Sequence, residues 1–238
     1  MPEFRKPHHR AVAAILSTMN VPFLERARCY FGGGTCVALL LDEFRESRDI
    51  DFLCSSRDGF RQLRETVTEG SLGRILRRKV PLAREVRSDR DGIRTFIAAG
   101  DLRIKFEIVL EARIDLKSAS DRFLGVPVLD LECVSAEKFL ANADRGLDES
   151  AKARDVIDLA FLAAHYGVKT LEPGMRLAET AYGSAVRHYL DLVLSKFAAD
   201  SRYASACARS LGIEDLGTLR KGLVKLKSLA GKRKKRNR

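Results

Sequence analysis

The sequence predicts an α+β chain in which a mixed half is followed by a helical half. Between residues 28 and 110, short segments of alternating apolar and polar residues lie between segments with helical spacing. From about residue 131 the alternation stops, and apolar residues recur at helical spacing. We therefore expect an α/β core over residues 1–130, a helical domain over residues 131–231 and a basic tail over residues 232–238.

The expected elements follow the chain in order. In the first half we expect helices over residues 8–19, 35–41, 60–67 and 72–78, and strands over residues 28–31, 50–54, 82–86, 93–98 and 101–110. In the second half we expect a short extended segment over residues 129–131, and then helices that begin at Ser135 and cover residues 151–166, 177–199 and 216–229. The adjacent His8 and His9 point in different directions on a helix, so we expect both at the surface.

Composition favours an anionic partner. The chain has 238 residues with 43 lysines and arginines against 32 aspartates and glutamates, a net charge of +11. Such a balance suits nucleic acid first, although simple solubility is equally compatible with it. The terminal basic run alone suggests no more than a solvated tail.

Cysteine usage and hydropathy indicate a cytoplasmic protein. The five cysteines are scattered, with no Cys-x-x-Cys pair, so neither a disulfide framework nor a zinc site is expected. The N-terminus lacks the apolar stretch of a secretory signal, and no apolar run is long enough to span a membrane.

A glycine turn followed by two carboxylates is the strongest candidate for chemistry. Gly33, Gly34 and Thr35 precede an apolar helical segment, and Asp49 and Asp51 then lie one residue apart in an apolar strand. Strand alternation places both acids on one face, where they repel each other unless a cation joins them. Carboxylates combined with substrate phosphates are the usual ligands of Mg²⁺. The alternative is a strand end with two solvated acids.

These residues resemble a known signature. Gly33-Gly34-Thr35, a spacer containing Arg45 and Ser47, and Asp49-Ile50-Asp51-Phe52 resemble the motif of the nucleotidyltransferase superfamily related to DNA polymerase beta. More narrowly, the chain resembles the AbiEii/AbiGii and MenT-like toxin nucleotidyltransferases over about residues 30–162. The resemblance implies a polymerase-beta-like core, a mixed sheet with flanking helices, followed by a helical C-terminal domain.

The resemblance also implies roles for the first motif. Asp49 and Asp51 would hold the metal, with Glu107 as a third carboxylate that helps to activate the acceptor hydroxyl. The backbone N–H groups of Gly33, Gly34 and Thr35 would hold the β- and γ-phosphates, with a hydroxyl from Thr35. Arg48 would neutralise phosphate or simply be exposed. Glu107 could equally pair with Lys105 on a solvated face, and Thr35 could equally cap a helix.

A second set of residues matches the family's C-terminal motifs. It comprises Lys138, Arg145, Lys152, Asp155 and Asp158. Lys138 and Arg145 are two helical turns apart and would reach the triphosphate, Lys152 would be a phosphate ligand, and Asp155 would orient groups or act as a base. The alternative is an ordinary charged helix face with local ion pairs.

The implied function is Mg²⁺-dependent transfer of a nucleoside monophosphate from an NTP to an acceptor hydroxyl, with one or two ions. The acceptor would be an RNA such as the tRNA 3′ end, in a toxin–antitoxin or abortive-infection system with a cognate antitoxin. Arg74, Arg77, Arg78 and Lys79 could hold RNA phosphates. The alternatives are transfer to a protein or small-molecule hydroxyl, and a catalytically silent nucleic-acid-binding module with the same fold.

Overall fold

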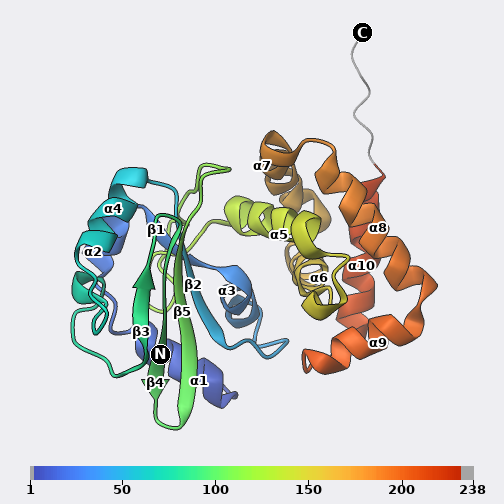
Figure 1. Ribbon diagram of the computed structural model, residues 1–238. Helices are drawn as coiled ribbons and strands as arrows, with labels where there is room; N and C mark the ends of the chain where they lie inside the picture. Colours follow the sequence, from blue (N-terminus) through green and yellow to red (C-terminus); the bar gives the residue numbers. More distant parts are fainter. Residues whose placement is uncertain (1–2, 232–238) are drawn as a thin grey trace. The chain divides into compact units, whose positions relative to one another are not determined.

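The computed structural model describes residues 3–231, and it divides into two compact units, the first ending at Asp130 and the second beginning at Leu131. The first unit contains helices and a sheet, whereas the described part of the second contains helices only (Figure 1). This is the expected α+β fold class. The predicted basic tail, residues 232–238, lies outside the described residues.

The first unit is built on one five-stranded mixed sheet. Its strands are β1 (Cys29–Gly32), β2 (Asp49–Cys54), β3 (Leu82–Ser88), β4 (Gly92–Ala99) and β5 (Leu102–Leu110). The spatial order is β1-β2-β5-β4-β3. Only β2 and β5 are parallel, and the other neighbours are antiparallel. This order places β2, which carries Asp49 and Asp51, beside β5, which carries Glu107.

One face of this sheet is covered and the other carries the polar residues. The helices of the unit are α1 (Pro7–Leu16), α2 (Val21–Arg26), α3 (Gly33–Leu40) and α4 (Arg57–Glu65), with a short 3₁₀ turn η1 (Gly73–Ile75). Residues of α1, α2 and α4 share one apolar core with Ile50 and Phe52 of β2 and with Ile104, Phe106 and Ile108 of β5. The alternation predicted for β5 is therefore confirmed, and the intervening Lys105 and Glu107 lie on the opposite face.

The second unit is a helical domain. Its elements are α5 (Leu131–Arg145), η2 (Glu149–Ala151), α6 (Arg154–Tyr166), η3 (Val168–Leu171), α7 (Glu172–Tyr182), α8 (Ala185–Ala199), α9 (Ser201–Ser210) and α10 (Leu216–Ala230). Helix α5 packs against α6, α7 and α8, and α10 packs against α6 and α8. Within this unit, α5 and α6 bring Lys138, Arg145, Asp155 and Asp158 together.

Several predicted boundaries were wrong, for local reasons. Residues 72–78 form only η1, because Gly73 takes a left-handed φ of +55° that interrupts a helix. Ser135 does not start a helix but lies inside α5, where its hydroxyl donates to the carbonyls of Leu131 and Glu132. Gly183, at φ +58°, divides the helix expected over 177–199 into α7 and α8.

Two helices were not expected at all, α2 and α9. The break predicted at residues 20–22 is in fact the start of α2, since Pro22 occupies the first turn of that helix. Among residues 3–231, no helix is long and apolar enough to cross a membrane.

Candidate active site

Asp49 and Asp51 lie on the open face of β2. Both are half-buried, whereas Ile50 and Phe52 between and after them are fully buried in the core. The buried neighbours fix the strand, and alternation then directs both carboxylates to the same side. The predicted arrangement of the pair is therefore present.

Gly33 lies so close to Asp51 that there is no room for a side chain. Strand β1 ends at Gly32, which pairs with Asp51, and α3 begins at the next residue. Gly33 has φ +70°, and a Cβ atom added there would overlap the carboxylate of Asp51. Both the backbone angle and the space thus require glycine. No side chain caps the N-terminus of α3, and Gly33 and Gly34 are only partly buried there. The turn therefore suits an anion.

A chain of buried hydrogen bonds ties this turn to the loop before β2. Thr35 is fully buried, and its hydroxyl donates to Oγ of Ser47 at 2.8 Å. The backbone N–H of Ser47 donates to Nε2 of His9 (3.2 Å), so the proton of His9 is on Nδ1, which lies 2.7 Å from Oε1 of Glu43. The hydroxyl of Thr35 thus holds Ser47, two residues before Asp49. Its predicted contact with a phosphate stays a prediction.

The burial of His9 was not expected, and the prediction of a surface position was wrong for this residue. Its exposed fraction is 0%, and burial lowers its pKa more than the contact with Glu43 raises it. Burial also acts to raise the pKa of Glu43, but backbone N–H groups of Arg5 and Lys6 and the His9 ring outweigh it and lower this pKa to about 2. Glu43 is 34 residues away in the chain, so no local pattern pointed to the pair.

Glu107 lies where the third carboxylate was expected, but it is held by two cations. It is opposite Asp51 across the parallel pair of β2 and β5. Its Oε1 accepts from Nε of Arg94 at 2.6 Å and its Oε2 from Nζ of Lys105 at 2.5 Å. Burial acts to raise its pKa, but Lys105 and Arg94 outweigh burial and lower it.

Lys105 is close to all three carboxylates. Burial acts to lower its pKa, but Glu107, Asp51 and Asp49 outweigh burial and raise it. The sequence predicts Lys105 on the face of Glu107 and as its possible partner, but it gives no sign of Arg94, which comes from the neighbouring strand β4. Within residues 3–231, no three His, Cys, Asp or Glu side chains gather in a form that could hold a metal ion.

Arg48 is exposed at the start of β2. Its Nε donates to Oε1 of Glu46 at 3.0 Å. The neighbouring Arg45 is instead buried. The predicted choice for Arg48 between phosphate contact and simple exposure therefore stays open.

In the second unit, four of the five predicted residues, Lys138, Arg145, Asp155 and Asp158, form an ion-pair cluster. Lys138 on α5 lies between two carboxylates of α6, with Nζ 3.0 Å from Asp155 and 2.7 Å from Asp158. Arg145, two turns along α5, donates from Nε to Asp155 at 2.8 Å. Lys138, Asp155 and Asp158 are each no more than 5% exposed. These pairs join two helices, rather than lying along one helix face.

Electrostatics keep Asp155 ionised. Its burial acts to raise its pKa, but Lys138 and Arg145 outweigh burial and place this pKa well below its usual range. Lys152 is exposed in the turn before α6, and it and Ala153 both take left-handed backbone angles, φ +52° and +48°. Such strain in two successive residues is typical of functional turns. The predicted phosphate contacts of Lys138, Arg145 and Lys152 stay predictions.

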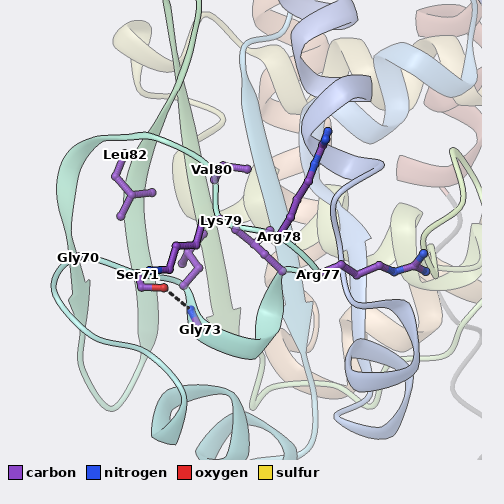
Figure 2. A pocket seen from close by; sticks show the side chains of 10 residues that line it. Gly70, Ser71, Gly73, Arg77, Arg78, Lys79, Val80 and Leu82 are labelled. Carbon is purple, nitrogen blue, oxygen red and sulfur yellow. Dashed lines mark hydrogen bonds between the residues drawn. The ribbon is translucent and has the colours of Figure 1, made fainter.

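Three of the four basic residues predicted to hold RNA line an open pocket before β3. Arg77, Arg78 and Lys79 border this pocket of ≈ 260 Å³ together with Ser71 and Gly73. Figure 2 shows the hydrogen bond between Ser71 and Gly73, and shows Arg77 and Arg78 extending away from it. All three cations are exposed. The segment is therefore accessible to an anion in solution.

Two comparisons with known proteins found a match. The family described as nucleotidyl transferase AbiEii toxin of type IV toxin–antitoxin systems matches residues 14–224. A solved structure of a candidate nucleotidyltransferase from H. pylori is similar, with 19% identity, a TM-score of 0.46 and coverage of 93% of this chain and 96% of that chain. No curated protein matches the chain.

The family match covers both motif sets, the turn with the Asp pair in the first unit and the Lys138 cluster in the second. It spans most of the chain rather than one segment. The chain therefore belongs to the AbiEii family of nucleotidyltransferase toxins of type IV toxin–antitoxin systems, and it is a nucleotidyltransferase.

Proposed function

We propose that this nucleotidyltransferase uses Mg²⁺ and an NTP, and that it transfers the nucleoside monophosphate to a terminal hydroxyl of RNA, such as the tRNA 3′ end. The observation that carries the proposal is the Asp49–Asp51 pair beside the glycine turn of Gly33. Family membership gives the reaction class and implies a cognate antitoxin. The ion, the acceptor and the residue roles are the proposal.

The Asp pair fits a hard divalent cation. Two carboxylates on one strand face are the donor set that Mg²⁺ takes together with substrate phosphates. The missing side chain of Gly33 leaves room next to the Asp51 carboxylate, where a Cβ atom would otherwise intrude. When bound, the ion would offset the negative charge of the triphosphate. Asp49 and Asp51 would hold it, and we favour one ion because Glu107 is occupied by Arg94 and Lys105.

The chain's own groups would bind and orient the triphosphate. The backbone N–H groups of Gly33 and Gly34, at the positive end of α3, offer donors to phosphate oxygens. Lys105 adds a cation next to both aspartates. The resemblance also implies phosphate contacts for Lys138, Arg145 and Lys152.

The reaction is a substitution at the α-phosphorus. The acceptor oxygen forms a bond to this phosphorus, the bond to the oxygen bridging to the β-phosphate breaks, and pyrophosphate leaves with that oxygen. The acceptor proton must pass to a base. Glu107 and Asp155 are the predicted candidates, but each has a lowered pKa from its cations, which makes it a weaker base than a free carboxylate.

The test is label transfer from each α-labelled NTP, with Mg²⁺ and purified tRNA, by wild type and by Asp51→Asn. We expect labelled RNA from wild type, and at least a hundredfold less from Asp51→Asn. If the label appears on protein instead, the acceptor is a protein hydroxyl. If cell extract replaces RNA and a small molecule is labelled, the acceptor is a small-molecule hydroxyl. Absence of label with every NTP and acceptor would favour a silent binding module.

A further inference from the structure

Two rows of side chains cross the open face of the sheet from the Asp pair to the edge strand β3. In the first row, Asp51 is opposite Glu107, Glu107 is opposite Arg94, and Arg94 is opposite Arg87. Residues directly opposite each other on neighbouring strands project to the same face. This row therefore begins at the proposed reaction centre and ends at an arginine on the edge.

The second row runs parallel to the first. Asp49 is opposite Lys105, Lys105 is opposite Phe96, and Phe96 is opposite Arg84. From β2 to β3 the rows cross three strand spacings, about 14 Å at about 4.8 Å each. A half-buried aromatic ring thus lies between a lysine and an arginine on the way to the edge.

An irregularity in β3 puts both edge arginines on this face. Arg84 and Arg87 are three residues apart, so regular alternation would place them on opposite faces. The register shifts between them, however, and their partners Phe96 and Arg94 are only two residues apart. The extra residue is the mark of a β-bulge, a device that re-aims side chains at sheet edges and beside active sites. Val86, inside the bulge, is buried.

The outer cations of this face have no carboxylate partner among the described residues. Arg84, Arg87 and Arg103 are exposed, and their side chains make no ion pair or hydrogen bond within residues 3–231. Arg87 is directly opposite Arg94, whose guanidinium group is already paired with Glu107 and Asp89. An anion bound beside Arg84, Arg87 and Arg103 would supply the counter-charge that these side chains lack.

We propose that this face, named here the acceptor track and consisting of Arg84, Arg87, Phe96 and Arg103, binds the phosphate backbone of the acceptor as single-stranded RNA. The inference rests on the proposed function, because it extends from the Asp pair, to which the acceptor hydroxyl must come. Cations flanking an aromatic ring on an open surface are the usual platform for single-stranded nucleic acid, whose bases stack on the ring. An acidic polypeptide would use the cations but not Phe96.

The test measures equilibrium binding of a fluorescent single-stranded oligoribonucleotide to the full chain without NTP, at salt concentrations from 50 to 200 mM. The logarithm of the association constant falls with log [salt], and each phosphate contact with a single strand makes this slope steeper by about 0.7. Arg84→Ala/Arg87→Ala should therefore make this negative slope shallower by about 1.4. Over the fourfold salt range, wild type should then lose about sevenfold more affinity than this variant. The control Arg57→Ala/Arg64→Ala, exposed arginines of α4, should leave the slope unchanged.

A second readout is the label-transfer reaction. The Arg84→Ala/Arg87→Ala variant should raise the KM for RNA and leave kcat unchanged, because these side chains contact the acceptor away from the reacting atoms. Phe96→Leu should weaken RNA binding without changing the salt slope, since stacking releases no counterions. A raised KM with an unchanged kcat indicates that the arginines contact the RNA, whereas a merely structural role would not change the KM for RNA alone.

The outcomes distinguish the track from the proposed function. If wild type labels RNA but the salt slope of Arg84→Ala/Arg87→Ala equals that of wild type, the acceptor track is wrong and the proposed function stands. A lowered slope without any RNA labelling supports the track as an RNA-binding surface and overturns the function. Competition by poly-glutamate as strong as by RNA of equal charge overturns the choice of RNA in favour of an acidic protein.

Discussion

Replacing Gly33 with alanine should separate activity from stability at the proposed site. A residue with a Cβ atom in the left-handed region costs about 1–2 kcal/mol, and Gly33 has φ +70°. The new Cβ would also overlap the carboxylate of Asp51, and moving that side chain off its preferred rotamer adds about 0.5–1.5 kcal/mol. We therefore expect a loss of about 1.5–3.5 kcal/mol in the free energy of unfolding.

The loss of activity should be larger than the loss of stability implies. Displacing the Asp51 carboxylate by about 1 Å can cost about a hundredfold in rate, because transfer depends on positioning. The control is Gly100→Ala in the turn between β4 and β5. Gly100 has φ +60°, but nothing lies within 4 Å of the Cβ that alanine would add. This variant carries the backbone strain without the overlap.

The assay is label transfer at saturating NTP, together with thermal denaturation of both variants. Gly100→Ala should be destabilised by about 1–2 kcal/mol and fully active. Gly33→Ala should remain folded and lose about a hundredfold in rate. If Gly33→Ala is as active as Gly100→Ala, the contact between the glycine turn and Asp51 does not position the reaction, and our reasoning is refuted.

Other outcomes follow from the buried charges. Lys138→Met should destabilise the chain by about 3–5 kcal/mol in urea denaturation, since it removes the ammonium group between the buried Asp155 and Asp158. A stable but inactive Lys138→Met would instead favour its predicted phosphate contact. Stability should also fall with acidification. His9 and Glu43 both have pKa values lowered by folding, so the folded chain binds fewer protons and loses stability below about pH 6.5, and more steeply below about pH 4.5. Denaturation midpoints between about pH 2 and 8 would measure this loss, and Glu43→Gln should flatten the curve in its acidic part, below about pH 4.5. A wild-type midpoint that does not change with pH would contradict it.

The elements of the proposed site could be predicted because their patterns are local. Alternation in β5, the apolar residues around Asp49 and Asp51, and the glycines before α3 are all visible within a few residues. Physical spacing alone was thus enough to place both carboxylates on one open face.

The remaining features depend on contacts between distant segments. The register that puts Arg94 and Lys105 on Glu107 is set by pairing of β2, β5 and β4. The bulge that turns Arg87 toward this face is a property of the pair β3 and β4. Likewise, the spacing of Asp155 and Asp158 showed a shared helix face, but not that α5 would supply Lys138 to it.

The measurement that tests the central claim most directly is pyrophosphate release in a single turnover, with RNA, NTP and Mg²⁺, by wild type, Asp49→Asn and Asp51→Asn. Each substitution removes one carboxylate from the proposed metal pair and changes the side chain's size very little. Our account predicts one pyrophosphate for each labelled RNA from wild type, and a loss of at least a hundredfold in rate for both variants. Transfer at the wild-type rate by a folded Asp51→Asn would contradict it.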